Sequence, residues 1–382
     1  MGNTNERTEI QTFKDNYDKR AMDTDPRYGK AKFYSKKSNP NEMIMTKEYI
    51  TNNLDESTSY DEMVEVRKNI NHENLAQCYV HQVDQESQFF TDFYKHSTAH
   101  EYYDHNMYKE IAARRSMDPP RAFSENEVWY AANAMIDLDN TLIDESIDTP
   151  HGDLQPKNVM YDEEGNIKIA DNAIITNQSA YQKCNFDDDY FAPLAPELLD
   201  DLRKTKVNPD YGYSNKAETF AVGVTSLAAA TGNYPEDYYD WKNKKWLGDK
   251  ANEDLQSLEG HKSPEQIAFI RRCLEEDPDK RWTIGEANEY LMPYKDLARQ
   301  KKLNFLNRKV AKTSELEGND FFDDDEKIVR EVFVEQGVKA IPKTTELEGN
   351  DFFDDDDLFH QDVVVEQGVT VHRQADSNAR FY

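Results

Sequence analysis

Cysteine is scarce in this chain. Three occur among 382 residues, at Cys78, Cys184 and Cys273, and no two of them form a C-x-x-C pair. Because their number is odd and their spacing wide, neither a disulfide framework nor a zinc site is indicated. A reducing compartment is the expected setting, and we predict a cytoplasmic protein.

Long apolar runs are also missing. The best one, Phe220–Thr231, is shorter than the roughly 20 residues that a membrane-spanning helix needs. The first residues, Met1–Glu6, carry no apolar region typical of a signal peptide. Glu6 also stands where a myristoylation motif has Ser or Thr. We therefore expect no membrane partner.

Positive charge is in deficit. The chain has 46 Lys and Arg against 75 Asp and Glu, a net charge of −29. The imbalance is steepest from Lys312 onward, where 7 basic residues face 19 acidic ones. Nucleic acids and anionic membranes bind basic surfaces, so neither is an expected partner. The hydrophobic share, 37%, is low enough that we expect polar segments outside a compact core.

The apolar pattern changes along the chain. Between Arg27 and Ser87, short β-type runs surround one helix, predicted over Tyr60–Ile70, and Gln88–Phe93 is interpreted as one more strand. A capping box then opens a helix from Ser124 to about Leu142. The later predicted elements are two short strands flanking residues 162–166 and helices at Glu218–Ala230, Pro264–Glu275 and Ile284–Tyr290. A small sheet-rich part is thus followed by a larger helical part.

One stretch, His151–Asn158, has the sequence HGDLQPKN and is the most informative. Asp153 stands five residues before Asn158, in a turn that precedes a predicted strand. In such a turn the carboxylate can orient a hydroxyl group and the amide can bind a metal ion, as phosphoryl transfer requires. Taken alone, the stretch is also compatible with an ordinary polar turn.

Further motifs follow it in a fixed order. After a predicted strand come Asp171, then Ala195–Glu197 (APE), then Glu218–Gly223 (ETFAVG), then Cys273–Thr283, which contains D-P-x-x-R. With HGDLQPKN, this series resembles the protein kinase family in its catalytic loop, metal-binding Asp, APE segment, central buried helix and C-terminal arginine. The resemblance implies an α+β, bilobal protein-kinase fold, with a small β-rich N-lobe and a larger α-helical C-lobe.

The resemblance also divides the chain. It places the kinase-like part between a polar N-terminal segment and an extended acidic C-terminal tail. The predicted divisions are the N-terminal segment 1–20, the N-lobe 21–95, the C-lobe 96–293, a basic linker 294–311 and the acidic tail 312–382.

By the same resemblance, functional roles fall on particular residues, and the implied cofactors are ATP and Mg²⁺. The residues that match these roles are the base Asp153, the Mg²⁺ ligands Asn158 and Asp171, and the ATP contacts Lys47 and Gly29. Glu197 and Arg281 match the positions of a buried ion pair that stabilises the larger lobe, and we expect that pair here.

The nucleotide side departs from the family pattern. Thr24 and Pro26 stand where the glycine-rich loop has glycines, and Pro26 has no N–H to offer a phosphate. Met45 replaces the small residue that leaves room for adenine, so we expect a crowded pocket. Met63 stands where the family has the glutamate that pairs with the lysine. Glu62 is one position away, turned by about 100° on a helix.

The catalytic side departs less. Asp171 is followed by Asn172 and Ala173 in place of Phe-Gly, which changes the packing between the lobes. Gln155 replaces the lysine of the catalytic loop, and Lys157 is the residue expected to substitute for it in catalysis. Phosphoryl transfer depends almost wholly on positioning and electrostatics, so these changes reduce the rate.

Three functions compete. The first is a pseudokinase that serves as a non-catalytic scaffold, which needs no cofactor. The second is a divergent active Ser/Thr protein kinase that transfers the γ-phosphate of ATP to protein hydroxyl groups. The third, an aminoglycoside- or choline-type phosphotransferase, would share an H-G-D loop, but the APE and D-P-x-x-R motifs favour the protein kinase branch.

The acidic tail contains an internal repeat. Lys312–Val338 and Lys343–Val369 share K-T-[ST]-E-L-E-G-N-D-F-F-D-D-D and later V-E-Q-G-V, with a period of 31 residues. Two copies are too few for a solenoid. Each copy joins paired phenylalanines in an acidic run to a β-prone stretch, which suits a basic-rimmed pocket and a sheet edge. We predict two docking segments for a protein partner within a larger assembly, of which a cytoskeletal one is an example.

Overall fold

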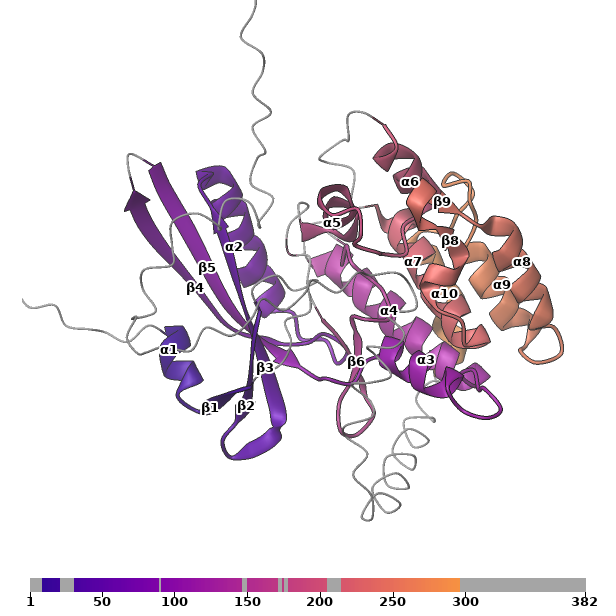
Figure 1. The fold of residues 1–382 in the computed structure, drawn as a ribbon, viewed down its shortest axis with the longest axis horizontal. Coiled ribbons are helices and arrows are strands. Elements are labelled where there is room, and N and C mark those ends of the chain that lie inside the picture. Colours follow the sequence, from indigo (N-terminus) through magenta and orange to yellow (C-terminus); the bar gives the residue numbers. More distant parts are fainter. Residues whose placement is uncertain are drawn as a thin grey trace, which may run out of the picture.

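The computed structural model describes residues 9–20, 31–88, 91–145, 150–170, 174, 178–204 and 214–295. These residues form two lobes, a sheet with one long helix against it and a bundle of helices (Figure 1). The α+β, bilobal architecture predicted from the sequence is therefore confirmed.

The smaller lobe is built on a five-stranded antiparallel sheet with the order β1-β2-β3-β5-β4. Helix α2 packs against β3, β4 and β5, and α1 packs against β4 and β5. The elements of this lobe are α1 (Glu9–Lys14), β1 (Tyr17–Arg20), β2 (Lys32–Lys36), β3 (Asn39–Thr51), α2 (Leu54–Lys68), β4 (Cys78–Gln88) and β5 (Thr91–Tyr102).

Helix α2 begins six residues before its predicted start. The side chain of Asn53 accepts hydrogen bonds from the backbone N–H groups of Asp55 and Glu56, which satisfies donors that a helix start leaves open. The two acidic residues of the first turn also suit the positive end of the helix dipole. The helix ends at Lys68, so Ile70 lies beyond it.

The end of the sheet differs most from the sequence interpretation. The single strand predicted at Gln88–Phe93 is wrong, because β4 ends at Gln88 and β5 begins at Thr91. The predicted boundary between residues 95 and 96 falls inside β5, which belongs to the sheet as far as Tyr102. The reason is physical: the interior residues of β5 are largely polar, with His96 and His100 both buried, so no apolar alternation marks the strand.

The larger lobe is mainly helical. It also contains two short two-stranded sheets, β6 with β7 and β8 with β9. Its elements are α3 (Met107–Arg115), α4 (Glu125–Glu145), β6 (Val159–Tyr161), β7 (Ile167–Ile169), α5 (Ala180–Phe186), α6 (Pro196–Leu202), α7 (Asn215–Thr231), β8 (Tyr239–Asp240), β9 (Lys245–Trp246), α8 (Gly248–Ser257), α9 (Pro264–Cys273) and α10 (Ile284–Leu291). Short 3₁₀ turns occur at Pro235–Tyr238, Trp241–Asn243 and Met292–Tyr294.

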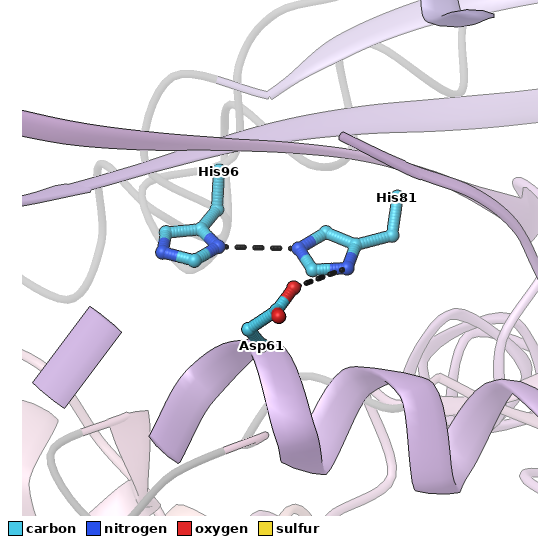
Figure 2. Close-up of side chains that lie close together, drawn as sticks. All are labelled: Asp61, His81 and His96. Carbon is cyan, nitrogen blue, oxygen red and sulfur yellow. Dashed lines mark hydrogen bonds and ion pairs between the residues drawn. The ribbon is translucent and has the colours of Figure 1, made fainter. Parts of the chain in front are cut away.

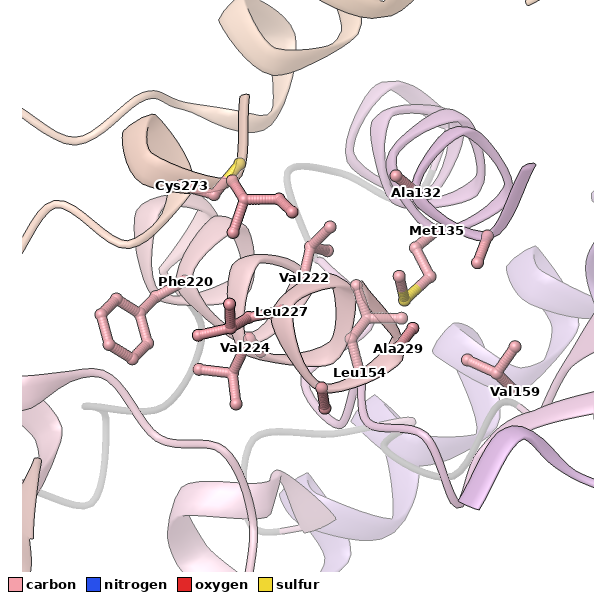
Figure 3. Packing of buried hydrophobic residues seen from close by; sticks show 14 of the residues in the cluster. Ala132, Met135, Leu154, Val159, Phe220, Val222, Val224, Leu227, Ala229 and Cys273 are labelled. Atoms are coloured by element: carbon pink, nitrogen blue, oxygen red, sulfur yellow. The ribbon is translucent and has the colours of Figure 1, made fainter. Parts of the chain in front are cut away.

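Helix α7 forms the centre of this lobe, as its apolar sequence predicts (Figure 3). It contacts α4, α9 and α10. Gly223 allows α9 to approach, because a Cβ there would lie 2.8 Å from Cβ of Cys273. The predicted capping box of α4 is present, with Ser124 and Glu127 each accepting from the other's backbone N–H. Within the described ranges, no helix is both long and apolar enough to cross a membrane.

Candidate functional site

The predicted catalytic loop lies between α4 and β6, and its histidine fixes the loop to the end of β7. Nε2 of His151 donates to the carbonyl oxygen of Ala170, at 2.8 Å. Nδ1 of His151 then accepts from the backbone N–H of Asp153, at 3.2 Å. The imidazole therefore holds the backbone of Asp153 beside the residue that immediately precedes Asp171.

Both carboxylate oxygens of Asp153 already accept hydrogen bonds. Oδ1 accepts from Nε2 of Gln155 at 2.5 Å, and Oδ2 lies 2.8 Å from Nζ of Lys183. The Asp153 side chain is 1% exposed and that of Lys183 is 20% exposed, so this ion pair is largely removed from water. A substrate hydroxyl group can approach Asp153 freely only if Lys183 moves.

Lys183 lies on α5, which is anchored directly to the catalytic loop. The backbone N–H of Ala180 donates to the carbonyl oxygen of Gly152 at 2.8 Å, and Ser179 caps the helix through the N–H of Gln182. The sequence analysis did not identify Lys183. The available signal was indirect: with Gln155 in place of a lysine, a buried carboxylate needs a cation from elsewhere.

The other two loop residues differ in where they point. Asn158 is buried, and its Nδ2 donates to the backbone oxygen of Asp153 at 2.7 Å, which closes the turn. Nζ of Lys157 lies 3.6 Å from Oε1 of Glu236 and 4.8 Å from the ring centre of Tyr108. The structure therefore brings Asn158 to Asp153, but directs the amine of Lys157 toward Glu236.

Two buried carboxyl groups, on α4 and α7, accept hydrogen bonds from the backbone of the loop. Oδ1 of Asp139, on α4, accepts from the backbone N–H of His151 at 2.6 Å. Glu218, on α7, accepts from the N–H groups of Gly152 and Leu154. Burial raises the pKa of Asp139 to about 7 and that of Glu218 well above its usual range. Their second oxygens, Oδ2 and Oε2, have no hydrogen-bond partner within the described residues, which also favours the neutral acids.

Met45, which the resemblance places beside adenine, belongs to a buried cluster. It lies on β3 and is 1% exposed, and both lobes contribute to the cluster. The rings of Phe33 and Tyr102, with centroids 4.7 Å apart, close one part of it. The members of the cluster are Ala31, Phe33, Met45, Ala76, Tyr102, Met160 and Ala170, with Met43 and Tyr103 packed against them.

Lys47 follows on the same strand. It pairs with Thr98 of β5 and is half-buried. Burial, together with the nearby positive charge of Lys47, lowers the pKa of His100 to about 3. Lys47 stands two residues after Met45 on β3 and so lies on the same face of the strand. On α2, Glu62 is exposed, whereas Met63 packs in a cluster that includes Ile174. The inward position of α2 is thus apolar, as the spacing predicts.

The expected ion pair of the larger lobe is confirmed. Arg281 binds Glu197 through two parallel contacts, 2.7 Å from Oε1 and 2.9 Å from Oε2. The arginine side chain is 0% exposed and donates further to three backbone oxygens, those of Glu275, Glu276 and Lys216. Such saturation is what a buried guanidinium group requires.

Several predicted features lie outside the described residues. Among the site residues these are Gly29 and Asp171, and beside them the substitutions at Thr24, Pro26, Asn172 and Ala173. The repeats Lys312–Val338 and Lys343–Val369 also lie outside them.

Comparisons with known proteins agree with the family that the sequence resembles. The family described as protein kinase domain matches residues 27–292. The chain is 30% identical over 143 residues to hormonally up-regulated neu tumor-associated kinase homolog A of Xenopus laevis, covering 36% of this chain and 19% of that protein. It is 27% identical over 152 residues to mitogen-activated protein kinase kinase 2 of Arabidopsis thaliana, covering 37% and 38%.

Human dual specificity mitogen-activated protein kinase kinase 7 is similar to the same degree. It is 31% identical over 137 residues, which cover 34% of this chain and 30% of that protein. In each case the chain spans less than two fifths of the curated relative's length.

Proposed function

Since this chain belongs to the protein kinase family, we propose that its kinase domain is a protein-binding scaffold with little or no phosphoryl transfer. The observation that carries the proposal is the buried cluster around Met45, where adenine would have to lie. A nucleotide pocket needs a preformed apolar space. Here that space is occupied by methionine and aromatic side chains of the protein itself.

The packing of this cluster sets the cost of nucleotide entry. Met45, Met160 and Phe33 are each 1–2% exposed, so each is in contact with neighbours on all sides. For a purine ring to enter, at least one of these side chains must leave the cluster and lose its contacts. That free energy would be subtracted from the affinity for ATP.

A second observation supports the proposal at the catalytic residue. Asp153 is held by Gln155 and Lys183, so its carboxylate is engaged before any substrate arrives. A catalytic base is useful only when it can reach the hydroxyl proton. The α5 helix that carries Lys183 therefore acts as a cover on this carboxylate.

A divergent active Ser/Thr kinase is the alternative, and one observation favours it. Asp153 and Asn158 are joined as an active loop would require, and Lys183 supplies at Oδ2 a cation that Gln155 cannot. In that case ATP and Mg²⁺ would be the cofactors, with Asn158 and Asp171 as metal ligands and Lys47 on the phosphates.

Isothermal titration calorimetry of the full chain with Mg·ATP tests the proposal. We expect no binding, or a dissociation constant weaker than micromolar, and recovery of measurable binding in Met45→Ala. Met135→Ala is the matched control, because Met135 is an equally buried methionine in the core around α7. A micromolar or tighter constant for the natural chain, about −8 kcal/mol or better, would refute the predicted loss of ATP binding, on which the proposal rests.

We propose that the scaffold binds its protein partner through the acidic tail. The two 31-residue repeats dock on one assembly, which has an equivalent binding site for each repeat. Tethering raises the effective concentration, so avidity can exceed the affinity of one copy by about 10²–10⁴. Replacing Phe321, Phe322, Phe352 and Phe353 by alanine should release the chain from its partners, as measured by quantitative pull-down. If the amount of recovered partner is unchanged, the tail is not the docking element.

A further inference from the structure

A cluster of polar side chains fills the space between helix α2 and strands β4 and β5, away from the catalytic loop. His81 comes from β4, His96 from β5 and Asp61 from α2, and Figure 2 shows the two rings edge to edge above the helix that carries Asp61. Both imidazoles are buried, whereas the Asp61 side chain is 51% exposed. Buried histidines in a sheet need partners for both ring nitrogens.

The distances in this cluster are short. Nε2 of His81 lies 3.1 Å from Nδ1 of His96, and the two ring planes lie within 9° of each other. Nδ1 of His81 lies 3.5 Å from Oδ1 of Asp61 and 3.5 Å from Oε1 of Glu65. Nε2 of His96 lies 2.9 Å from Oγ of Ser57.

We propose that Asp61, His81 and His96 form a binding site for a divalent transition metal ion, of which Zn²⁺ fits the ligand set best. Within the described residues, these three offer one ligand atom each, all within 4.8 Å of one another. Tetrahedral zinc bonds of about 2.0–2.2 Å place neighbouring ligand atoms about 3.3–3.6 Å apart. The contacts of His81 with His96 and with Asp61 use its two different ring nitrogens. The His81 ring must therefore turn so that one of these nitrogens faces an ion that His96 and Asp61 also reach.

The protonation state of the rings suits this role. Burial lowers the pKa of His81, and burial with the nearby His81 lowers the pKa of His96 to about 4. Both imidazoles are thus neutral near pH 7, which is the form that binds metal ions. Two nitrogens and a carboxylate oxygen are donors that zinc prefers over magnesium or calcium.

The surroundings supply the remaining requirements of a metal site. Glu65, 49% exposed, stands one helical turn from Asp61 and can provide the fourth ligand or hold a water molecule there. The hydroxyl of Ser57 can accept from Nε2–H of His96 and so fix that ring. Nδ1 of His96 would then bind the ion in place of its present contact with His81. The exposed carboxylates leave an entry path from solvent, while the imidazoles close the inner side.

The ion would join α2 to the two neighbouring strands. That helix also reaches the catalytic loop, because Arg67 donates to the carbonyl oxygen of Pro150 at 3.0 Å. Metal binding would therefore hold in place the helix that connects the lobes. The sequence offers no signal for such a site, because its ligands come from three separate elements with no short motif between them.

Cobalt titration of the full chain, freed of metal by a chelator, tests the site. Four-coordinate Co²⁺ bound through imidazole gives intense visible absorption, whereas carboxylate and water oxygens alone give six-coordinate, weakly coloured ions. The difference separates this site from metal bound by the acidic tail. We expect one equivalent of intense absorption, its displacement by Zn²⁺, and at least tenfold weaker binding of both ions in His96→Gln.

Two further variants make the test independent of folding. Asp61→Asn changes a half-exposed side chain on the helix surface and should also weaken Zn²⁺ binding at least tenfold, with unchanged circular dichroism. His100→Gln is the matched control, since His100 is a buried histidine of the same strand outside the ligand set, bonded to Thr98. Absence of the absorption in the natural chain, or equal binding by Asp61→Asn and the natural chain, would show that the cluster is a hydrogen-bonded chain only.

Discussion

The catalytic loop and the nucleotide side of this kinase domain differ in how far their residues also serve to hold the fold together. In the loop, His151 and Asn158 make hydrogen bonds that hold the backbone together, and Asp153 closes an ion pair. On the nucleotide side, the small residue that Met45 replaces has no task except to leave room for a ligand. A loop motif can thus be present for structural reasons, whereas the burial of Met45 bears directly on the proposed loss of nucleotide binding.

The largest expected effect lies in the larger lobe, on which the catalytic loop depends. Arg281→Ala should lower the free energy of unfolding by about 3–5 kcal/mol, because it leaves Glu197 without its partner and several backbone oxygens without a donor. Arg271→Ala on the exposed face of α9 is the matched control and should change it by less than about 0.5 kcal/mol. Equal midpoints of the two variants in urea would contradict a buried pair.

On the nucleotide side, Met45→Ala should cost about 2–5 kcal/mol of stability, because it deletes a fully buried side chain. If the cavity that it leaves accepts adenine, Mg·ATP should restore part of that loss, since a ligand that binds only the folded state stabilises it. Thermal unfolding with and without Mg·ATP measures both quantities. A variant as stable as the natural chain would mean that the cluster around Met45 is loosely packed.

The sequence predicted the two sides unequally well. Motifs located Asp153, Asn158, Glu197 and Arg281, because the chemistry of each depends on near neighbours in the chain or on a fixed motif. The helix at α4 followed from its capping box. Lys183 had no such signal, because it reaches Asp153 only through the packing of α5. Strand β5 was missed because its buried residues are largely polar, so no apolar alternation marks it.

The two neutral acids below the loop give a pH-dependent comparison. Asp139 has a usual pKa of 3.8, raised by burial to about 7 in the folded chain. The folded state therefore holds a proton that the unfolded state releases, so this stabilisation is present at acid pH and is lost as the pH rises from about 4 to about 7.

Asp139→Asn mimics the protonated acid and should remove that dependence. Relative to the natural chain, its stability should improve with rising pH by at most about 1.4 kcal/mol per pH unit within this window. Urea unfolding between pH 5 and pH 8 measures the difference in stability between the variant and the natural chain. Asp249→Asn, at an exposed position of α8, is the control. Parallel curves for Asp139→Asn and the natural chain would place the carboxylate of Asp139 in its ionised form.

The smallest expected effect on stability comes from Lys183, yet it separates the two functions most clearly. Lys183→Met should cost about 1–2 kcal/mol, because Gln155 still donates to the Asp153 carboxylate after the partly exposed amine is lost. Under the scaffold proposal, transfer from radiolabelled ATP stays at background in both the natural chain and this variant. Lys157→Met is the matched control, since its amine contacts Glu236 instead. Transfer that is measurable in the natural chain, persists in Lys157→Met and vanishes in Lys183→Met would establish the active kinase, with Lys183 in the role that Gln155 cannot fill.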